Sequence, residues 1–132
     1  MSAAFADTFF FLALLSERDP AHAQALAFSR SLGRIVTSEF VLLELGNACA
    51  RAADHGDFLA LVSGIRASAR FEVLPLESRW LERGLQIMSE RKDKDWSLTD
   101  CISFAMMRER TLNQALTGDH HFSQAGFTAL FT

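Results

Sequence analysis

Short apolar runs that alternate with longer helical patterns most constrain the fold of this chain. Five runs have the length and composition of strands: Ala3–Ala6, Ile35–Thr37, Phe71–Leu74, Ala115–Thr117 and, as a possible edge strand, Thr128–Phe131. Helical patterns separate most of them, and parallel strands need long crossovers of this kind. We therefore expect an α/β fold, a three-layer α/β/α sandwich with right-handed crossovers around a central, mostly parallel sheet of four to five strands.

Capping residues bound several of the expected helices. Asp19 can cap a helix that has Pro20 in its first turn and ends near Ser31. Ser38 can cap a long helix through Ala53, which His55-Gly56 is expected to break. The remaining expected helices are Thr8–Leu15, Asp57–Ala69, Glu77–Arg91 and Leu98–Arg110.

Length and composition predict a single domain over residues 1–132. Of the 132 residues, 49% are hydrophobic and 22% charged, which suits one buried core. The longest apolar stretch, Phe9–Leu15, is far shorter than the roughly 20 residues of a membrane span, and no cleavable leader precedes it. Cys49 and Cys101 lie in apolar helical patterns, so we expect buried free thiols. These features predict a cytoplasmic protein with no membrane association.

The charge of the chain gives no general attraction to nucleic acid. The formal net charge is −3 and the sequence pI is about 5.8. An enzyme that acts on a polyanion would need local compensation at its site. The basic residues that could form such a rim are Arg51, Arg66, Arg70, Arg79, Arg83, Arg91, Lys92 and Lys94.

Four carboxylates lie at strand ends or in helices with apolar faces, where an ionised group is expected to be close to the core. Asp7 and Asp119 each follow a strand, and ligands of open α/β sheets bind beyond the carboxyl ends of strands. Glu44 interrupts an apolar helix face, and Asp100 opens another helix. Because a lone ionised carboxylate costs several kcal/mol to desolvate, converging acids are usually neutralised by a cation. Oxygen ligands suit Mg²⁺ or Mn²⁺, and such an ion serves phosphodiester hydrolysis.

Each acid taken singly also has a simpler explanation. Asp7 can cap the helix that follows it, and Asp100 can form a capping box with Ser97. Asp119 can be a turn residue, and Glu44 can pair with a basic side chain across the core edge. The four together favour one shared site over four separate coincidences.

In their order and spacing, the segments around these acids resemble the PIN-domain ribonucleases, particularly the VapC-type toxins of bacterial toxin-antitoxin pairs. The resemblance covers nearly the whole chain. It is carried by Ala6-Asp7-Thr8, by Thr37-Ser38-Glu39-Phe40-Val41-Leu42-Leu43-Glu44, by Trp96-Ser97-Leu98-Thr99-Asp100-Cys101-Ile102-Ser103-Phe104, and by Leu116-Thr117-Gly118-Asp119-His120-His121-Phe122 with Gly126-Phe127 downstream.

The resemblance implies a metal-dependent endoribonuclease, the toxin of a type II toxin-antitoxin system. Its catalytic and metal-binding residues would be Asp7, Glu44, Asp100 and Asp119, around one or two ions of magnesium or manganese. Its substrate would be RNA, and its partners a small antitoxin and often a second copy of the chain. Glu44 would complete the metal shell through water or act as a general base, and the sequence leaves both roles open.

Hydroxyl groups next to such carboxylates commonly fix their orientation, which makes Thr8, Ser38 and Thr117 candidates for that role. Asp95 also lies near the helix that Asp100 opens, although the place of Asp100 just before an apolar run favours Asp100. His121 is expected to pack or hydrogen-bond near the site.

One alternative function stays open at this level. A non-catalytic protein could keep the PIN scaffold and act by binding protein or RNA, with its acids merely structural.

No zinc site is expected at His120 and His121, because the chain lacks a His-x-x-x-His motif or a cysteine pair. The phenylalanine-rich segment Phe9–Leu15, like the Leu26–Phe28 region, is expected either to form a partner surface or to be buried on two sides.

Overall fold

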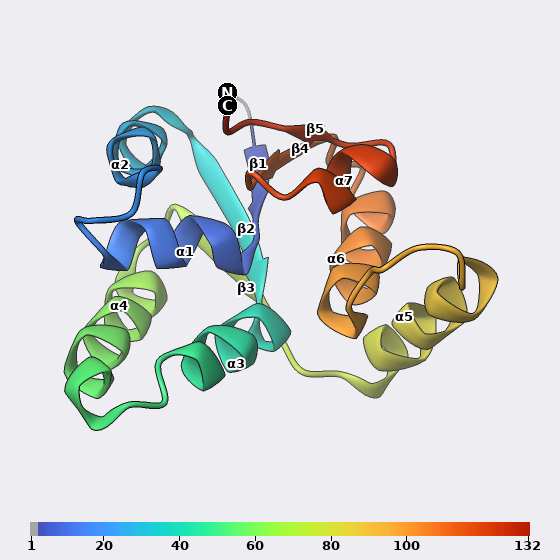
Figure 1. Cartoon of the computed structure of the whole chain (residues 1–132), viewed down its shortest axis with the longest axis horizontal. Coiled ribbons are helices and arrows are strands. Elements are labelled where there is room, and N and C mark those ends of the chain that lie inside the picture. The colour runs from blue at the N-terminus through green and yellow to red at the C-terminus, as the bar shows by residue number, and fades with distance from the viewer. Residues whose placement is uncertain (1–2) are drawn as a thin grey trace.

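A parallel sheet between two layers of helices forms the centre of the molecule (Figure 1). The computed structural model describes residues 3–132, and the strand order is β3-β2-β1-β4-β5 with every pair parallel. The five strands are β1 (Ala3–Ala6), β2 (Arg34–Ser38), β3 (Phe71–Leu74), β4 (Gln114–Leu116) and β5 (Thr128–Ala129). The sequence-based expectation of an α/β sandwich with a parallel sheet is confirmed.

Helices cover both faces of this sheet. In Figure 1, α1, α2 and α4 lie on one side of the sheet, and α6 and α7 lie on the other. The helices are α1 (Thr8–Leu15), α2 (His22–Ser31), α3 (Glu39–Ala48), α4 (His55–Ala67), α5 (Ser78–Glu90), α6 (Leu98–Glu109) and α7 (His120–Gln124), with a short 3₁₀ turn at Ala52–Asp54.

The alanine-rich strand β1 is the centre of the sheet, where it pairs with β2 on one side and with β4 on the other. Ala4, Phe5 and Ala6 are all fully buried. Because side chains alternate along a strand, the two alanines line one face and Phe5 lines the other. Fully buried aromatic side chains on the helices, such as Phe104 of α6, supply the volume that β1 lacks.

The end of α3 differs from expectation. The helix was expected to reach Ala53 but ends at Ala48, and the backbone N–H of Cys49 donates to the carbonyls of Leu45 and Gly46. Residues 50–53 are exposed, so no packing holds them in the helix despite their alanine content. The expected break at His55-Gly56 is also wrong, since these residues begin α4.

The phenylalanine-rich helix α1 is buried on more than one side. Phe10 and Phe11 are fully buried, whereas Leu12 is 37% exposed. Phe9 packs edge-on against Phe131, with ring centroids 5.2 Å apart. Burial therefore accounts for most of this apolar surface and leaves Leu12 as its exposed part.

The cysteine prediction is confirmed, since Cys49 and Cys101 are buried and free. Within residues 3–132, none of the helices combines the length and apolar character that a membrane crossing demands.

Close packing of α5 on α6 depends on Gly84. A Cβ atom there would overlap Ile102 Cγ1 and lie 3.2 Å from the Ile102 backbone nitrogen. We therefore expect Gly84→Ala to lower the free energy of unfolding by about 1–3 kcal/mol, measured by urea unfolding. Gly64→Ala in α4 is the matched control, because nothing lies within 4 Å of its added Cβ. Helix propensity should make that variant more stable by about 0.5–1 kcal/mol, and a Gly84→Ala protein that shared this gain would contradict the packing argument.

Candidate active site

The four predicted acids line one pocket. Asp7 directly follows β1, and Asp119 lies beyond β4 as the N-cap of α7. Glu44 comes from α3, and Asp100 from the first turn of α6. The pocket has a volume of about 380 Å³, and Asp95 contributes to its wall as well. Since β1 and β4 are adjacent and parallel, their carboxyl ends place Asp7 and Asp119 at the same edge of the sheet.

Asp7 is buried and has a strongly raised pKa. Its side chain is 5% exposed and accepts a hydrogen bond from Thr117 Oγ1 at 3.1 Å. Desolvation, followed by the nearby charge of Asp100 and that of Glu44, raises the pKa of Asp7 from 3.8 to about 7. A carboxylate in this position is unfavourable when ionised, unless a cation comes close to it.

Asp100 has a capping role and a place in the pocket at the same time. The Ser97 N–H donates to Asp100 Oδ2 at 3.1 Å, and the Asp100 N–H donates to Ser97 Oγ at 3.0 Å. Desolvation, helped by the charge of Asp119, raises the pKa of Asp100, and its bonds from Ser97 and His121 oppose that rise. The capping box fixes the carboxylate, so the simpler explanation and the functional one are compatible.

Hydroxyl groups hold the other carboxylates. Thr8 Oγ1 donates to Glu44 Oε1 at 2.5 Å. Thr117 Oγ1, besides donating to Asp7, accepts the backbone N–H of Asp119 at 3.0 Å. Two of the three expected hydroxyls therefore contact the acidic pocket, whereas Ser38 caps α3 by accepting the N–H of Val41.

No arginine or lysine among residues 3–132 pairs with any of the four acids. Arg51, which follows Glu44 by seven residues and is a basic side chain, lies 3.8 Å from Asp54. His121 was expected to pack or hydrogen-bond near the site, and its Nδ1 indeed lies 3.2 Å from Asp100 Oδ2 and 3.3 Å from Asp119 Oδ1. The only sign of it in the sequence is its position two residues after an acid that ends a strand.

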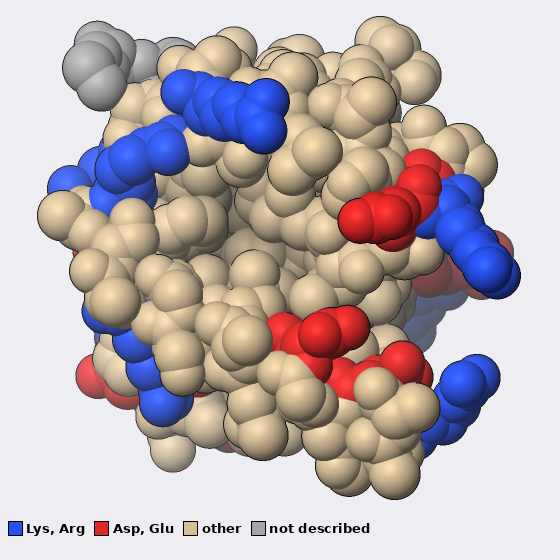
Figure 2. All heavy atoms as spheres, turned by 90° about the vertical axis from the view of Figure 1, so that its left-hand side faces the viewer, with Lys and Arg blue, Asp and Glu red and all other residues tan. Residues whose placement is uncertain are grey.

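The expected basic rim does not line this pocket, whose described walls contain no lysine or arginine. Several of the candidate arginines pair with acids elsewhere, as Arg79 and Arg83 do with Glu109, and Arg91 with Asp93. Figure 2 shows the side of the molecule that faces left in Figure 1, where basic side chains gather toward the upper left and at the right edge, and most acidic ones lie to the right of the centre. On that face the described residues form no continuous basic surface.

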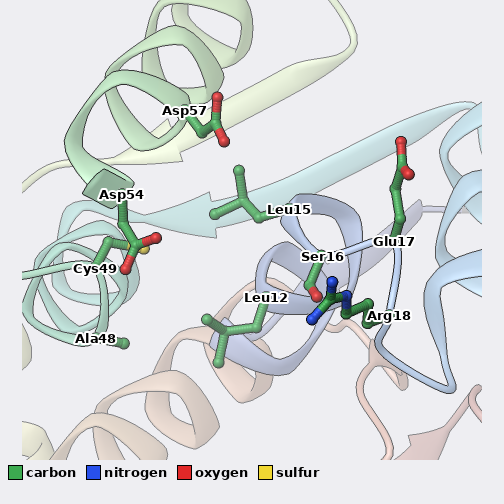
Figure 3. Close-up of a pocket in the computed structure, with 9 residues that line it drawn as sticks. All are labelled: Leu12, Leu15, Ser16, Glu17, Arg18, Ala48, Cys49, Asp54 and Asp57. Atoms are coloured by element: carbon green, nitrogen blue, oxygen red, sulfur yellow. The ribbon is translucent and has the colours of Figure 1, made fainter. Parts of the chain in front are cut away.

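A second pocket of about 440 Å³ adjoins the acidic one at Leu12, which lines both. In Figure 3, Leu12 and Leu15 extend from α1 toward the segment that carries Cys49 and Asp54. Asp57 of α4 lies on its wall too. The pocket thus combines an apolar floor with acidic side chains.

Thr117 joins two of the acids, which makes it a sensitive position. Thr117→Val removes the hydroxyl that donates to Asp7 and accepts from Asp119. We expect the affinity for a divalent ion to fall by about 10–100-fold, measured by calorimetry, because the carboxylates lose their orientation. Thr117→Ser keeps the hydroxyl and should bind nearly as wild type. A loss in Thr117→Ser as large as that in Thr117→Val would contradict this argument, because Thr117→Ser keeps the hydroxyl.

Comparison with known proteins agrees with this geometry. A model of the PIN domain family matches residues 4–128. The chain is 31% identical over 124 residues to the 23S rRNA-specific endonuclease VapC20 of Mycobacterium tuberculosis strain H37Rv, covering 93% of this chain and 94% of that protein.

Solved structures give the same result. The crystal structure of Mycobacterium tuberculosis VapC20, a sarcin-ricin loop cleaving toxin, matches with a TM-score of 0.87 and 27% identity, over 99% of this chain and 100% of that one. The DNA-bound VapBC structure from Salmonella typhimurium matches in fold, with a TM-score of 0.69 and 22% identity over 98% of this chain and 97% of that one. Both the sequence and the fold therefore confirm the resemblance drawn from the acidic motifs: the chain belongs to the PIN-domain family.

Proposed function

We propose that this chain is a metal-dependent endoribonuclease that hydrolyses RNA phosphodiester bonds and acts as the toxin of a type II toxin-antitoxin system. The observation that carries the proposal is the convergence of Asp7, Glu44, Asp100 and Asp119 on one pocket without a pairing lysine or arginine among residues 3–132. The endonuclease activity of VapC20 on 23S rRNA supports RNA as the substrate.

The donor set suits a hard divalent ion. Asp7, Asp100 and Asp119 offer carboxylate oxygens, the ligands that Mg²⁺ and Mn²⁺ prefer. The raised pKa of Asp7, about 7, is what an acid shows when burial and like charges act on it without a neighbouring cation. When bound, such an ion lowers the pKa of water and neutralises charge on the scissile phosphate.

The protein's own contribution is to hold and orient the carboxylates of the pocket. Thr117 fixes Asp7, and the capping box with Ser97 fixes Asp100, so the carboxylates need little rearrangement to act together. Glu44, held by Thr8, lines the same pocket, where it can orient the attacking water or take its proton as a general base. Phe9 and Leu12 give the pocket an apolar wall that limits water around the reacting groups.

The proposed role as a toxin also implies protein partners, an antitoxin and a second copy of the chain. A toxin that cleaves ribosomal RNA works in the cytoplasm and needs an antitoxin. The pocket at Leu12 and Leu15, with Asp54 and Asp57 on its wall, suits an antitoxin segment that carries apolar and basic side chains. Exposed leucines suit contact with a second copy of the chain, among them Leu43, Leu59 and Leu76, which are 57%, 61% and 53% exposed.

Metal removal tests the proposal. We expect the purified chain to cleave a 23S rRNA fragment in Mg²⁺ or Mn²⁺, to lose the activity in EDTA, and to regain it with excess metal, as followed on denaturing gels. Activity that persists in EDTA would exclude a metal-dependent mechanism. An absence of cleavage under every metal condition, with RNA or protein binding retained, would favour the non-catalytic scaffold instead.

A further inference from the structure

A group of three possible metal ligands lies at the border of the acidic pocket. Asp119, His120 and His121 each offer one ligand atom, and these atoms lie within 4.8 Å of one another. Asp119 Oδ1 is 3.3 Å from His121 Nδ1 and 3.7 Å from His120 Nδ1. In a tetrahedral zinc site with bonds of about 2.0–2.1 Å, the ligand atoms lie about 3.3–3.4 Å apart. The separation between Asp119 and His121 already fits, and the exposed ring of His120 can turn to shorten its distances to the other two atoms, which lie within 4.8 Å.

The chemistry of this group differs from that of the four-carboxylate pocket. Two imidazoles and one carboxylate suit borderline ions such as Zn²⁺, Ni²⁺ and Cu²⁺, whereas Mg²⁺ prefers oxygen ligands only. We propose that Asp119, His120 and His121 bind a transition-metal ion of the zinc class, with water in the fourth position. The sequence alone argued against such a site, because no spaced histidine pair is present, and the fold instead directs two adjacent imidazoles to one carboxylate.

Asp119, the carboxylate of this group, is held in place before any ion arrives. Asp119 Oδ1 accepts the backbone N–H of His121 at 2.9 Å, which fixes the carboxylate. The Asp119 N–H is in turn bonded to Thr117 Oγ1 at 3.0 Å. The two imidazole rings lie with their centroids 4.5 Å apart. Asp119 therefore loses little freedom when an ion binds, and the main cost is to order the exposed ring of His120.

Occupation of this site would inhibit the enzyme. His121 Nδ1 also lies 3.2 Å from Asp100 Oδ2, so an ion on that nitrogen removes a hydrogen-bonding partner from Asp100. The same ion would hold Asp119 and place a second positive charge beside the pocket, which disfavours Mg²⁺ or Mn²⁺ there. This inhibition rests on the proposed function, whereas the zinc site itself does not.

Calorimetric titration of Zn²⁺ into the metal-free protein tests the site. We expect wild type to bind one zinc ion, and His120→Ala, which removes a ligand outside the acidic pocket, to bind it at least about tenfold more weakly. His55→Ala is the matched control, because His55 is exposed and its imidazole bonds only to the Ala50 carbonyl. Its zinc affinity should equal that of wild type.

Two further measurements distinguish this site from the acidic pocket. Asp7→Asn should keep its zinc affinity, because Asp7 is not a ligand in this group. Zinc should reduce both the rise in melting temperature caused by Mn²⁺ and Mn²⁺-dependent RNA cleavage in wild type, but not in His120→Ala. The proposal is overturned if His120→Ala binds zinc as tightly as wild type, or if Asp7→Asn abolishes binding. If wild type cleaves no RNA, the proposed function fails, and the zinc isotherms still decide the site.

Discussion

Asp7→Asn should lower the rate of RNA cleavage by about 10³-fold or more and yet make the metal-free protein more stable above neutral pH. The loss of activity is expected because a metal ligand worth several kcal/mol in the transition state is removed, and about 1.4 kcal/mol corresponds to a factor of ten. The gain in stability is expected because Asp7 is 5% exposed and has a pKa near 7, so its ionised form is unfavourable in the fold. Asparagine is nearly isosteric, and its carbonyl oxygen can still accept the Thr117 hydroxyl.

The measurements are single-turnover cleavage in Mn²⁺ and urea unfolding in EDTA at pH 8. Asp95→Asn is the matched control, since Asp95 lines the same pocket but is exposed. We expect it to lose less than about tenfold in rate, which would settle the competition between Asp95 and Asp100 in favour of Asp100. An Asp7→Asn protein that cleaves RNA as fast as wild type would remove the basis of the catalytic assignment.

The metal-free protein should become less stable as the pH rises from 5 to 9. The pKa of Asp7 is about 7 in the folded chain, compared with 3.8 for the ordinary group, so the fold favours the protonated form. The stability that this proton contributes is fully present below pH 3.8 and is lost as the pH rises through 7. Between pH 5 and 9 the loss amounts to about 3 kcal/mol, and the raised pKa of Asp100 acts in the same direction.

Urea unfolding in EDTA across this pH range measures the effect. Excess Mn²⁺ should remove most of the loss, because it binds the ionised carboxylates of the folded state and leaves the unfolded chain almost unaffected. Asp7→Asn should flatten the metal-free curve. If wild type and Asp7→Asn show the same dependence on pH, another group is responsible and Asp7 is not strained by burial.

The parts of the fold that could be predicted are those with local causes. The alternation of apolar runs and helical patterns led to the parallel sheet, and the Ser97 capping box was visible in the spacing of Ser97 and Asp100. The end of α3 could not be predicted, because alanines that favour a helix follow Ala48 but find nothing to pack against. The short helix α7 also escaped prediction, since it depends on one cap at Asp119 and has only five residues.

The sequence named four acids that the structure brings to one pocket, but it did not reveal the contacts around them. The four motifs occur in family order, so the residues could be named before the structure was known. The bond from Thr117 to Asp7 joins positions 110 residues apart, and no local pattern encodes it. The approach of His121 to Asp100 depends in the same way on the packing of α7 against α6. Long-range packing decides such contacts, and a single sequence does not reveal it.

The central position of β1 has a consequence for biosynthesis. One of its two neighbours, β4, is translated more than a hundred residues after β1. A nascent chain that has reached only α5 therefore has Asp7 and Glu44 without Asp100 or Asp119. The acidic pocket is therefore incomplete during most of synthesis, because Asp100, Asp119 and His121 are the last of its residues to be translated.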